Sequence, residues 1–526
     1  MKLFVLPLLI STAVSAWEFP FADLFSGTVL KQQPFSAPSP SSEPEPTSAV
    51  PRVAVIGAGA AGSSAAFWIS KAKQRFGIDV EVDIFEKSDY VGGRSTTVQP
   101  FNDSAYAPME LGASIFVEIN KNMWRASNEF NLTRIGFTGD DGEGMGIWDG
   151  SQFLFTEGDL GWTGPLSSWY DTIKVLWRYG FASPTKARAL VKNLTDSFVT
   201  LYDSNSPRWS NISSIVEHLG WDAQVSQTGL DYFTAHGVSE KFAREIITAA
   251  TRVNYAQDVD TIHGLEAAVS LAASGAAAVE GGNWRVFDQF VKRSGARLLL
   301  NTEVQSIKKV SSGKWTVKST AGSSDYTAVL LAAPAPNSGI TLPPYVLSQL
   351  PDVAYIDLHV TLLSTTSVRP NSTYFGGARV PDMVLTTRGA EFNSLSYHGR
   401  LKSATGEPIE PAQWLVKIFS MQRVSDEWLE DMFGKPGWVL RKEWEPYPVL
   451  PPTNIFPPVK LDEGLYYINA FEPLISTMET ETLASRNVVE LMLSDKFDLP
   501  GLCPPLAESF STEDKKGDFV YGWDCL

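Results

Sequence analysis

The chain has 526 residues, of which 44% are hydrophobic and 12% aromatic, enough apolar material for two or three packed domains and too much for a disordered protein. Its formal net charge of −16 repels nucleic-acid phosphates and anionic membrane surfaces, which favours a small or neutral substrate. With 2 cysteines, 5 histidines and no ligand pair at zinc spacing, the composition predicts no metal centre.

The N-terminus has the pattern of a secretory signal peptide. Residues 1–16 combine Lys2, a short apolar run and small residues before Trp17, where a signal peptidase would cleave. The apolar run is too short to span a bilayer, and no other stretch is a candidate for a transmembrane span. Residues 17–51, which are rich in proline and serine in their second half, predict an extended linker.

Two further features agree with entry into the secretory pathway. Five Asn-x-Ser/Thr sequons offer glycosylation sites, namely Asn102, Asn131, Asn193, Asn211 and Asn371. Cys503 and Cys525 could form a bridge in an oxidising compartment, the alternative being two unpaired thiols. We therefore expect a protein that is secreted or delivered to a lysosome or vacuole.

The first folded segment has the pattern of a dinucleotide-binding unit. A buried strand begins near Arg52 and runs into Gly57, Gly59 and Gly62, which have the GxGxxG spacing. The first glycine allows a tight turn, the second lets the backbone approach a pyrophosphate, and the third lets the following helix pack on the strand. That helix directs its free N–H groups at the phosphates. Glu86 ends the next predicted strand, where its carboxylate can accept hydrogen bonds from an adenosine ribose.

A second glycine pair favours FAD over NAD as the dinucleotide. Gly92, Gly93 and Arg94 follow the acidic residue closely, and the arginine could add charge-assisted hydrogen bonds to the same pyrophosphate. A Gly-Gly-Arg sequence taken alone is usually only a turn. Its position after Glu86 makes it informative.

The rest of the chain alternates between helical and strand patterns. From about residue 119 to 280 the apolar spacing is mainly helical, which predicts a lid or substrate wall. Strand character returns in the segments 296–307, 315–319 and 328–333. A second insertion at 345–460 alternates strand-like segments with proline-rich loops, and residues 465–494 predict a strand, a loop and an amphipathic helix.

These patterns predict an α/β protein with a discontinuous Rossmann-like FAD-binding domain and an inserted substrate domain of helices plus mixed sheet. The FAD-binding domain is expected to comprise residues 52–118, 281–344 and 461–500. The substrate domain is expected at 119–280 and 345–460, and a C-terminal tail at 501–526.

Four longer segments are more specific than the glycine motifs: RVNYAQD at 252–258, the run at 264–284 that ends in EGGNW, WLVKIFS at 414–420 and YYINAFEPLISTMETETLASRNV at 466–488. With them the chain resembles the prenylcysteine oxidases, also called prenylcysteine or farnesylcysteine lyases, over most of its folded length. The resemblance implies a fold like that of the amine oxidases, FAD as cofactor, and an oxidase that acts on a small apolar thioether with molecular oxygen. The implied reaction cleaves the thioether of S-prenyl-L-cysteine to a prenyl aldehyde, free cysteine and hydrogen peroxide.

The resemblance also assigns residues to the cofactor. It implies FAD contacts from Gly57, Gly59, Ala60, Ala61, Gly62, Glu86, Lys87, Gly92, Gly93, Arg94, Val304, Glu472, Met478 and Glu479. It places Gly281, Gly282 and Asn283 in the wall of the cofactor site or active site. No protein partner follows from it.

The sequence constrains the catalytic residues less. A dry apolar channel is needed for a prenyl tail, and the helical block offers aromatic candidates, although aromatics at helical spacing are more often core: Trp169, Trp177, Phe181, Phe198 and Phe233. His236 is the candidate base, since histidine titrates near neutral pH, and a structural or exposed histidine is the competing interpretation. Two other functions stay open: a related flavin oxidase of another apolar thioether or amine, and a flavin-holding protein that binds a lipidic partner without turnover.

Overall fold

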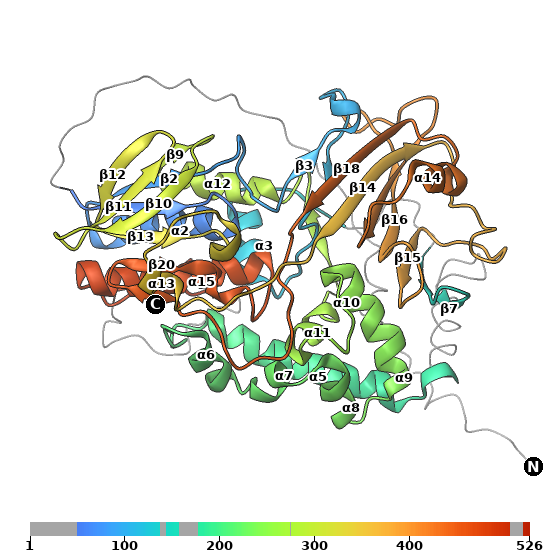
Figure 1. Ribbon diagram of the computed structural model, residues 1–526, viewed down its shortest axis with the longest axis horizontal. Helices are drawn as coiled ribbons and strands as arrows, with labels where there is room; N and C mark the ends of the chain where they lie inside the picture. The colour runs from blue at the N-terminus through green and yellow to red at the C-terminus, as the bar shows by residue number, and fades with distance from the viewer. Residues whose placement is uncertain (1–49, 137–143, 157–176, 274, 505–518, 526) are drawn as a thin grey trace, which may run out of the picture.

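Two large sheets and a block of helices organise the molecule. The structure, a computed structural model, describes residues 50–136, 144–156, 177–273, 275–504 and 519–525. The sheets lie at the left and right of Figure 1, and the helical block lies beneath them. The predicted signal peptide and nearly all of the predicted linker fall outside the described residues.

The first sheet joins strands that are far apart in the sequence. Its order in space is β19 (Lys460–Asp462), β20 (Leu465–Tyr467), β13 (Ala328–Leu331), β1 (Arg52–Ile56), β2 (Glu81–Phe85) and β9 (Arg297–Leu299). All neighbouring pairs are parallel except β19 and β20. The short apolar runs of β1 and β13 are buried almost throughout, as expected for central strands of a parallel sheet that is covered on both faces.

Three helices pack with this sheet. They are α2 (Ala60–Phe76), α12 (Trp284–Ser294) and α15 (Met478–Phe497), and α2 packs against both of the others. The first half of α2 consists largely of alanine, serine and glycine, so its backbone can approach its neighbours closely. A small antiparallel sheet adjoins this region and comprises β10 (Val304–Lys309), β11 (Trp315–Ser319) and β12 (Gly322–Tyr326).

The prediction of an amphipathic helix in 465–494 was wrong for α15, which is buried on nearly every side. Several of its buried polar side chains are hydrogen-bonded inside the protein. Ser485 donates to the carbonyl oxygen of Ala61 at 2.6 Å, and Arg486 donates to the carbonyl oxygen of Leu201 at 2.6 Å. The helix therefore connects the first sheet to the helical block, and a polar residue on it does not mark an exposed face.

The second sheet is mixed. Its order is β18 (Trp438–Trp444), β14 (Leu358–Thr365), β17 (Trp414–Ser420), β16 (Ser394–Arg400), β15 (Met383–Thr386), β6 (Met145–Trp148) and β7 (Phe153–Thr156). Only β15 and β6 pair in parallel among these strands. Helix α14 (Asp426–Phe433) shares an apolar core with one face of the sheet, which leaves the other face for the interior of the molecule.

The helical block connects the two halves. It comprises α5 (Ala182–Phe198), α6 (Ile212–Leu219), α7 (Asp222–Ser226), α8 (Gly229–Ala235), α9 (Glu240–Phe242), the π-helical turn η4 (Ala243–Ile247), α10 (Thr248–Tyr255) and α11 (Gly264–Ser270). Helix α10 packs against β15 of the second sheet. On the other side, the Trp209 N–H donates to the side chain of Asn487 on α15 at 3.0 Å.

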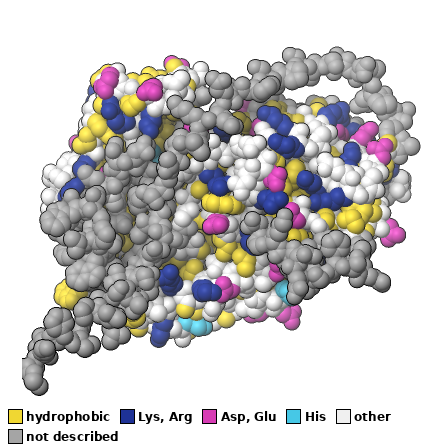
Figure 2. Space-filling view, turned by 180° about the vertical axis from the view of Figure 1, so that it is seen from behind, with side chains coloured by type: hydrophobic (Ala, Val, Ile, Leu, Met, Phe, Trp, Pro, Cys, Tyr) yellow, Lys and Arg dark blue, Asp and Glu magenta, His cyan; other side chains and the backbone are white. Residues whose placement is uncertain are grey.

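Most of the predicted elements are present. The mainly helical pattern predicted for about 119–280 is confirmed from α5 to α11. The same range also contains β5 (Arg134–Gly136), β8 (Ala277–Val279) and two strands of the second sheet, β6 and β7, which were not predicted. The strands at 315–319, 328–333 and 414–420 are confirmed, whereas the predicted strand at 296–307 is split into β9 and β10. No helix within the described ranges is long and apolar enough to cross a membrane. On the face seen in Figure 2 acidic and basic side chains are interspersed, so the net negative charge does not form one acidic patch there.

The C-terminal tail is fixed to the first half of the molecule. Cys503 and Cys525 form a disulfide, which decides between the bridge and the two unpaired thiols. Next to the bridge, the Trp523 ring lies 5.0 Å from that of Phe67 on α2, and its indole N–H donates to the Asn122 side chain at 3.1 Å. The disulfide therefore holds the buried Trp523 ring against α2.

Candidate cofactor and substrate site

A cavity of about 740 Å³ lies where the two sheets and the helical block meet. This volume is in the range of small-molecule and cofactor sites. One end is lined by the loops after β1 and β2 and by the start of α15. The other end is lined by β15, β16 and β17 and by residues of α5, α10 and α11, so a single space joins the two halves of the protein.

The glycine turn after β1 closes the first end. Gly57 has a φ of 108°, and its N–H donates to the carbonyl oxygen of Phe85 at 2.7 Å, which ties the turn to the end of β2. A Cβ on Gly62 would lie 1.9 Å from the carbonyl oxygen of Gly57, so only glycine allows α2 to start this close to β1. Ala60 and Ala61 form the first turn of α2 and line the cavity.

The second glycine pair lies directly against this turn. Gly59 and Gly92 form a parallel bridge, and the Gly92 N–H donates to the carbonyl oxygen of Ala58 at 3.0 Å. A Cβ on Gly93 would lie 3.2 Å from the Cα of Gly59. The two loops thus form one backbone surface without side chains, which suits the close approach of a pyrophosphate.

Glu86 follows β2 and lines the same end of the cavity. Its carboxylate accepts the Ala58 N–H and the Ser88 N–H, both at 2.8 Å. A carboxylate has about four acceptor positions, so two remain for the hydroxyls of a ribose. Lys87 lies at the exposed rim beside it. This arrangement fits the adenosine part of a dinucleotide.

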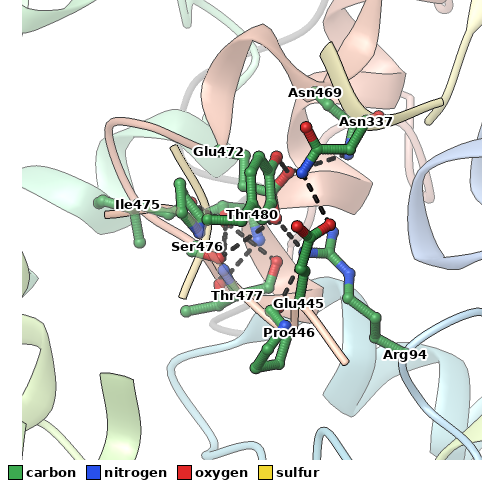
Figure 3. Close-up of polar contacts among 12 residues, drawn as sticks. Arg94, Asn337, Glu445, Pro446, Asn469, Glu472, Ile475, Ser476, Thr477 and Thr480 are labelled. Atoms are coloured by element: carbon green, nitrogen blue, oxygen red, sulfur yellow. Dashed lines mark hydrogen bonds and ion pairs between the residues drawn. The ribbon is translucent and has the colours of Figure 1, made fainter. Parts of the chain in front are cut away.

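Arg94 lines the cavity, but its charge is already paired. Its guanidinium forms an ion pair with Glu472 and donates to the carbonyl oxygen of Pro446 at 2.8 Å (Figure 3). The hydroxyl of Tyr355 donates to the other oxygen of Glu472 at 2.8 Å. The protein itself therefore pairs the charge of Arg94. A ligand can contact the edge of the guanidinium, but it does not meet an unpaired charge there.

The start of α15 presents a buried polar group without a partner. Both carboxylate oxygens of Glu481 are buried and lack a hydrogen-bond partner in the described structure, and this residue lines the cavity. Burial, and then the charge of Glu472, raise the pKa of Glu481 well above its ordinary value, which favours its protonated form. Nearby, Met478 accepts a hydrogen bond from Ser95 at 2.9 Å. A protonated Glu481 needs an acceptor, which a bound cofactor would provide.

Glu479 lines the cavity and also caps a helix. Its carboxylate accepts the N–H groups of Asn122 and Met123, both at 2.9 Å, and the hydroxyl of Tyr202 at 2.6 Å. These two amides belong to the first turn of α3 (Lys121–Glu129), whose N–H groups lack partners within the helix. The side chain therefore caps α3, and its assignment to the cofactor stays a prediction.

The remaining predicted positions divide into two groups. Val304 begins β10, is buried and lines the cavity beside the loop that follows β9. The second group does not line the cavity, so the assignment of Gly281, Gly282 and Asn283 to the wall of the site was wrong. The Asn283 side chain instead bonds the backbone on both sides, accepting from Val279 at 2.8 Å and donating to Ala113.

One face of the second sheet forms the wall that the sequence did not predict. Its cavity-lining side chains alternate along the strands and are Met383, Leu385, Ser394, Ser396, His398, Lys417 and Phe419. The signal that could have marked this wall is Lys417, the charged residue in the otherwise apolar strand WLVKIFS. Lysine is rarely buried in such a strand unless it is paired or functional.

A buried tyrosine and glutamate pair lies on the helical side. Tyr255 ends α10 and lines the cavity, and the nearby carboxyl of Glu266 on α11 acts on its hydroxyl electrostatically. The same carboxyl accepts the Ser476 N–H at 3.1 Å. Burial raises the pKa of Glu266 to about 8, so this carboxyl is largely protonated at neutral pH.

The aromatic channel candidates are mostly elsewhere. Phe198 lines the cavity, as predicted. Phe233 is fully buried in the helical core, whereas Trp177 and Phe181 are 91% and 61% exposed, so none of these three lines it. Trp169 falls outside the described residues. The chamber is lined instead by smaller apolar residues: Leu194, Val253, Val269, Ala272, Ala273 and Ala276.

His236 is not placed to act as the base. It is exposed at the end of α8 and does not line the cavity. Its Nδ1 lies 2.7 Å from the carbonyl oxygen of Tyr232, so the ring closes the last turn of its own helix. The competing interpretation of an exposed, structural histidine is the one that the geometry supports.

Two family models match the chain. Residues 165–498 match the model for prenylcysteine lyase, and residues 55–130 match the model for an NAD(P)-binding Rossmann-like domain. The second match covers β1, the glycine turn, β2 and the second glycine pair, so the Rossmann-like character of this half is established.

Individual relatives agree with the first match. The chain is 30% identical to a farnesylcysteine lyase of Arabidopsis thaliana and 29% identical to prenylcysteine oxidase 1 of Homo sapiens, in each case over 84% of this chain and 88% of the relative. The solved structure of a cyclohexylamine oxidase from Brevibacterium oxydans has the same fold, with a TM-score of 0.54 at 16% identity over 84% of this chain and 98% of that one. The chain therefore belongs to the prenylcysteine lyase family.

Proposed function

We propose that this protein is an FAD-dependent oxidase that cleaves the thioether of S-prenyl-L-cysteine. The products are a prenyl aldehyde, free cysteine and hydrogen peroxide, with molecular oxygen as the final electron acceptor. The observation that carries the proposal is the continuous cavity, which leads from the backbone cradle at Gly59 and Gly92 to an apolar chamber in a member of the prenylcysteine lyase family.

The residues present fit FAD. Glu86 has acceptor positions for the adenosine ribose, the two glycine loops leave backbone room for the pyrophosphate, and α2 begins beside them. At the far side of the cradle, a protonated Glu481 lacks an acceptor that the cofactor could supply. Bound there, FAD would provide the hydride acceptor that the reaction requires.

The chemistry uses the position of the substrate carbon between sulfur and an allylic double bond. Both neighbours stabilise the cation that develops when this carbon loses a hydride. Water then adds to the carbon, and the resulting hemithioacetal releases the aldehyde and the thiol. The protein contributes an apolar chamber, lined by Leu194, Phe198 and Val269, which orients the prenyl tail and limits the access of water.

Anaerobic mixing with farnesylcysteine tests this function. We expect the visible absorbance of the bound flavin to bleach, and we expect farnesal, cysteine and, in air, peroxide to form in equal amounts. S-dodecylcysteine is the matched control, since its saturated chain lacks the allylic double bond and should bleach the flavin far more slowly. Formation of farnesol or a diene with the flavin unchanged would rule out the oxidative mechanism.

We also propose that the protein passes through the secretory pathway and is then secreted or retained in a lysosome or vacuole. The signal-like residues 1–16 support this, and so do the Cys503–Cys525 bridge and the exposure of the asparagine in every one of the five sequons. Protein purified from its own host should begin after the signal segment and should lose mass on enzymatic deglycosylation. A mature chain that starts at Met1 and shows no mass change would contradict the proposal.

A further inference from the structure

The wall of the second sheet brings a buried cation into the apolar half of the cavity. Successive strand residues point to opposite faces, so Ser396 and His398 on β16 and Lys417 and Phe419 on β17 face the cavity. Ile418, which lies between Lys417 and Phe419, and Val416, which precedes the lysine, pack in the apolar core beneath α14. Ser396 and Lys417 are direct cross-strand partners, so their side chains lie next to each other.

The ammonium group of Lys417 is only partly satisfied by the protein. The residue is 4% exposed, and its Nζ donates to the carbonyl oxygen of Glu110 at 3.0 Å and to the hydroxyl of Ser114 at 2.9 Å. It also lies 4.8 Å from the centre of the Phe419 ring. An ammonium has three donors, and the described structure pairs two of them.

Two titratable groups on neighbouring strands act on Lys417. Glu110 on β4 (Met109–Glu110) and His398 on β16 are the titratable groups that act on it, and the facing position on β14 is Leu362. Burial lowers the pKa of Lys417 to about 8 and that of His398 to about 3, and it raises the pKa of Glu110 to about 7. The negative charge of an ionised Glu110 raises the pKa of Lys417, so these two groups titrate together, whereas His398 stays neutral.

A buried ammonium that lines a ligand cavity and has a donor left over is suited to bind an anion. We propose that Lys417, with the Ser396 hydroxyl beside it, binds the α-carboxylate of the substrate and makes the enzyme prefer the free acid over its methyl ester. This inference rests on the proposed function, because S-prenylcysteine has one carboxylate and one long apolar tail. The cavity offers both environments, the lysine on the sheet wall and the apolar chamber between α5, α10 and α11.

Binding of a ligand that cannot be oxidised tests the assignment separately from turnover. S-dodecyl-mercaptopropionate has a carboxylate, a thioether and a saturated tail, lacks an amino group, and can be compared with its methyl ester by calorimetry at about pH 6. We expect the acid to bind roughly 10- to 100-fold more tightly than the ester, as is usual for a charge-assisted hydrogen bond. The difference should nearly vanish in Lys417→Met and be largely kept in Lys417→Arg. Lys318→Met is the matched control, because Lys318 is an exposed strand lysine outside the cavity.

A purely structural lysine would behave differently. Equal binding of acid and ester by the wild-type protein, or a preference that survives in Lys417→Met, would overturn the assignment. The wild-type protein gives a second test that needs no variant, since the preference should shrink several-fold from about pH 6 to about pH 9 as the lysine loses its proton; a preference that does not shrink would count against the lysine. If the acid preference depends on Lys417 but farnesylcysteine is not oxidised, the proposed reaction fails and the carboxylate site stands.

Discussion

Gly62→Ala is expected to give a folded protein that retains little or no FAD. The added Cβ would lie 1.9 Å from the carbonyl oxygen of Gly57 and 3.0 Å from a methyl of Val55, and the first contact is with backbone, which cannot rotate away. The first turn of α2 must therefore move outward from β1. That turn and the Gly57 loop form one end of the cavity, so the amides that would bind the pyrophosphate lose their positions.

The measurement is the amount of flavin released per mole of purified protein, together with a thermal unfolding curve. We expect flavin content to fall more than 10-fold, with much of the fold retained, because the change is confined to the start of one helix. Gly77→Ala at the other end of α2 is the matched control. Gly77 has a φ of 66° and no atom within 4 Å of an added Cβ, so this change costs about 1 kcal/mol of backbone strain and should keep the flavin. Normal flavin content in Gly62→Ala would show that close packing of the helix is not needed for the site.

The cofactor half could be predicted because its pattern is local. The turn at Gly57, the close helix contact at Gly62 and the carboxylate of Glu86 lie within one strand, helix and strand unit, and backbone geometry alone restricts which residues can occupy these places. The fold class could be predicted for the same reason. The sequence alone is sufficient to predict a site whose residues are close both in space and along the chain.

The substrate half could not be predicted in the same way. Lys417 and Ser396 become neighbours through strand register, and Glu110 reaches them from a strand near the N-terminus. None of these relations follows from spacing in the chain. His236 shows the opposite error, since it was chosen for its chemistry alone and lies on the surface. Glu479 shows that even a position in a specific motif can serve the fold, here as the cap of α3.

The folded protein should lose stability as the pH rises from about 6.5 to 8. Burial raises the pKa of Glu110 and Glu479 to about 7 and that of Glu266 to about 8, from an ordinary value of 4.5. Over this range the folded state binds more protons than the unfolded state, so the stability present at lower pH is lost as the pH passes through the folded pKa values. The buried histidines His263 and His398 have lowered pKa values, and their opposite effect on stability fades above the ordinary histidine pKa of about 6.5.

Each such group changes stability by at most about 1.4 kcal/mol per pH unit, so the free energy of unfolding should fall by about 3 kcal/mol across this range. Urea unfolding at the two pH values measures this fall. Glu266→Gln should remove the largest part of the slope, because Glu266 has the highest of these three pKa values, whereas Glu217→Gln at an exposed position on α6 should keep the wild-type slope. Stability that is constant or rises between pH 6.5 and 8 would show that these carboxyls are ionised in the folded protein. A fold that is stabilised by protonated carboxyls is better suited to an acidic compartment than to a neutral one, and the lysine on the sheet wall is charged under the same conditions.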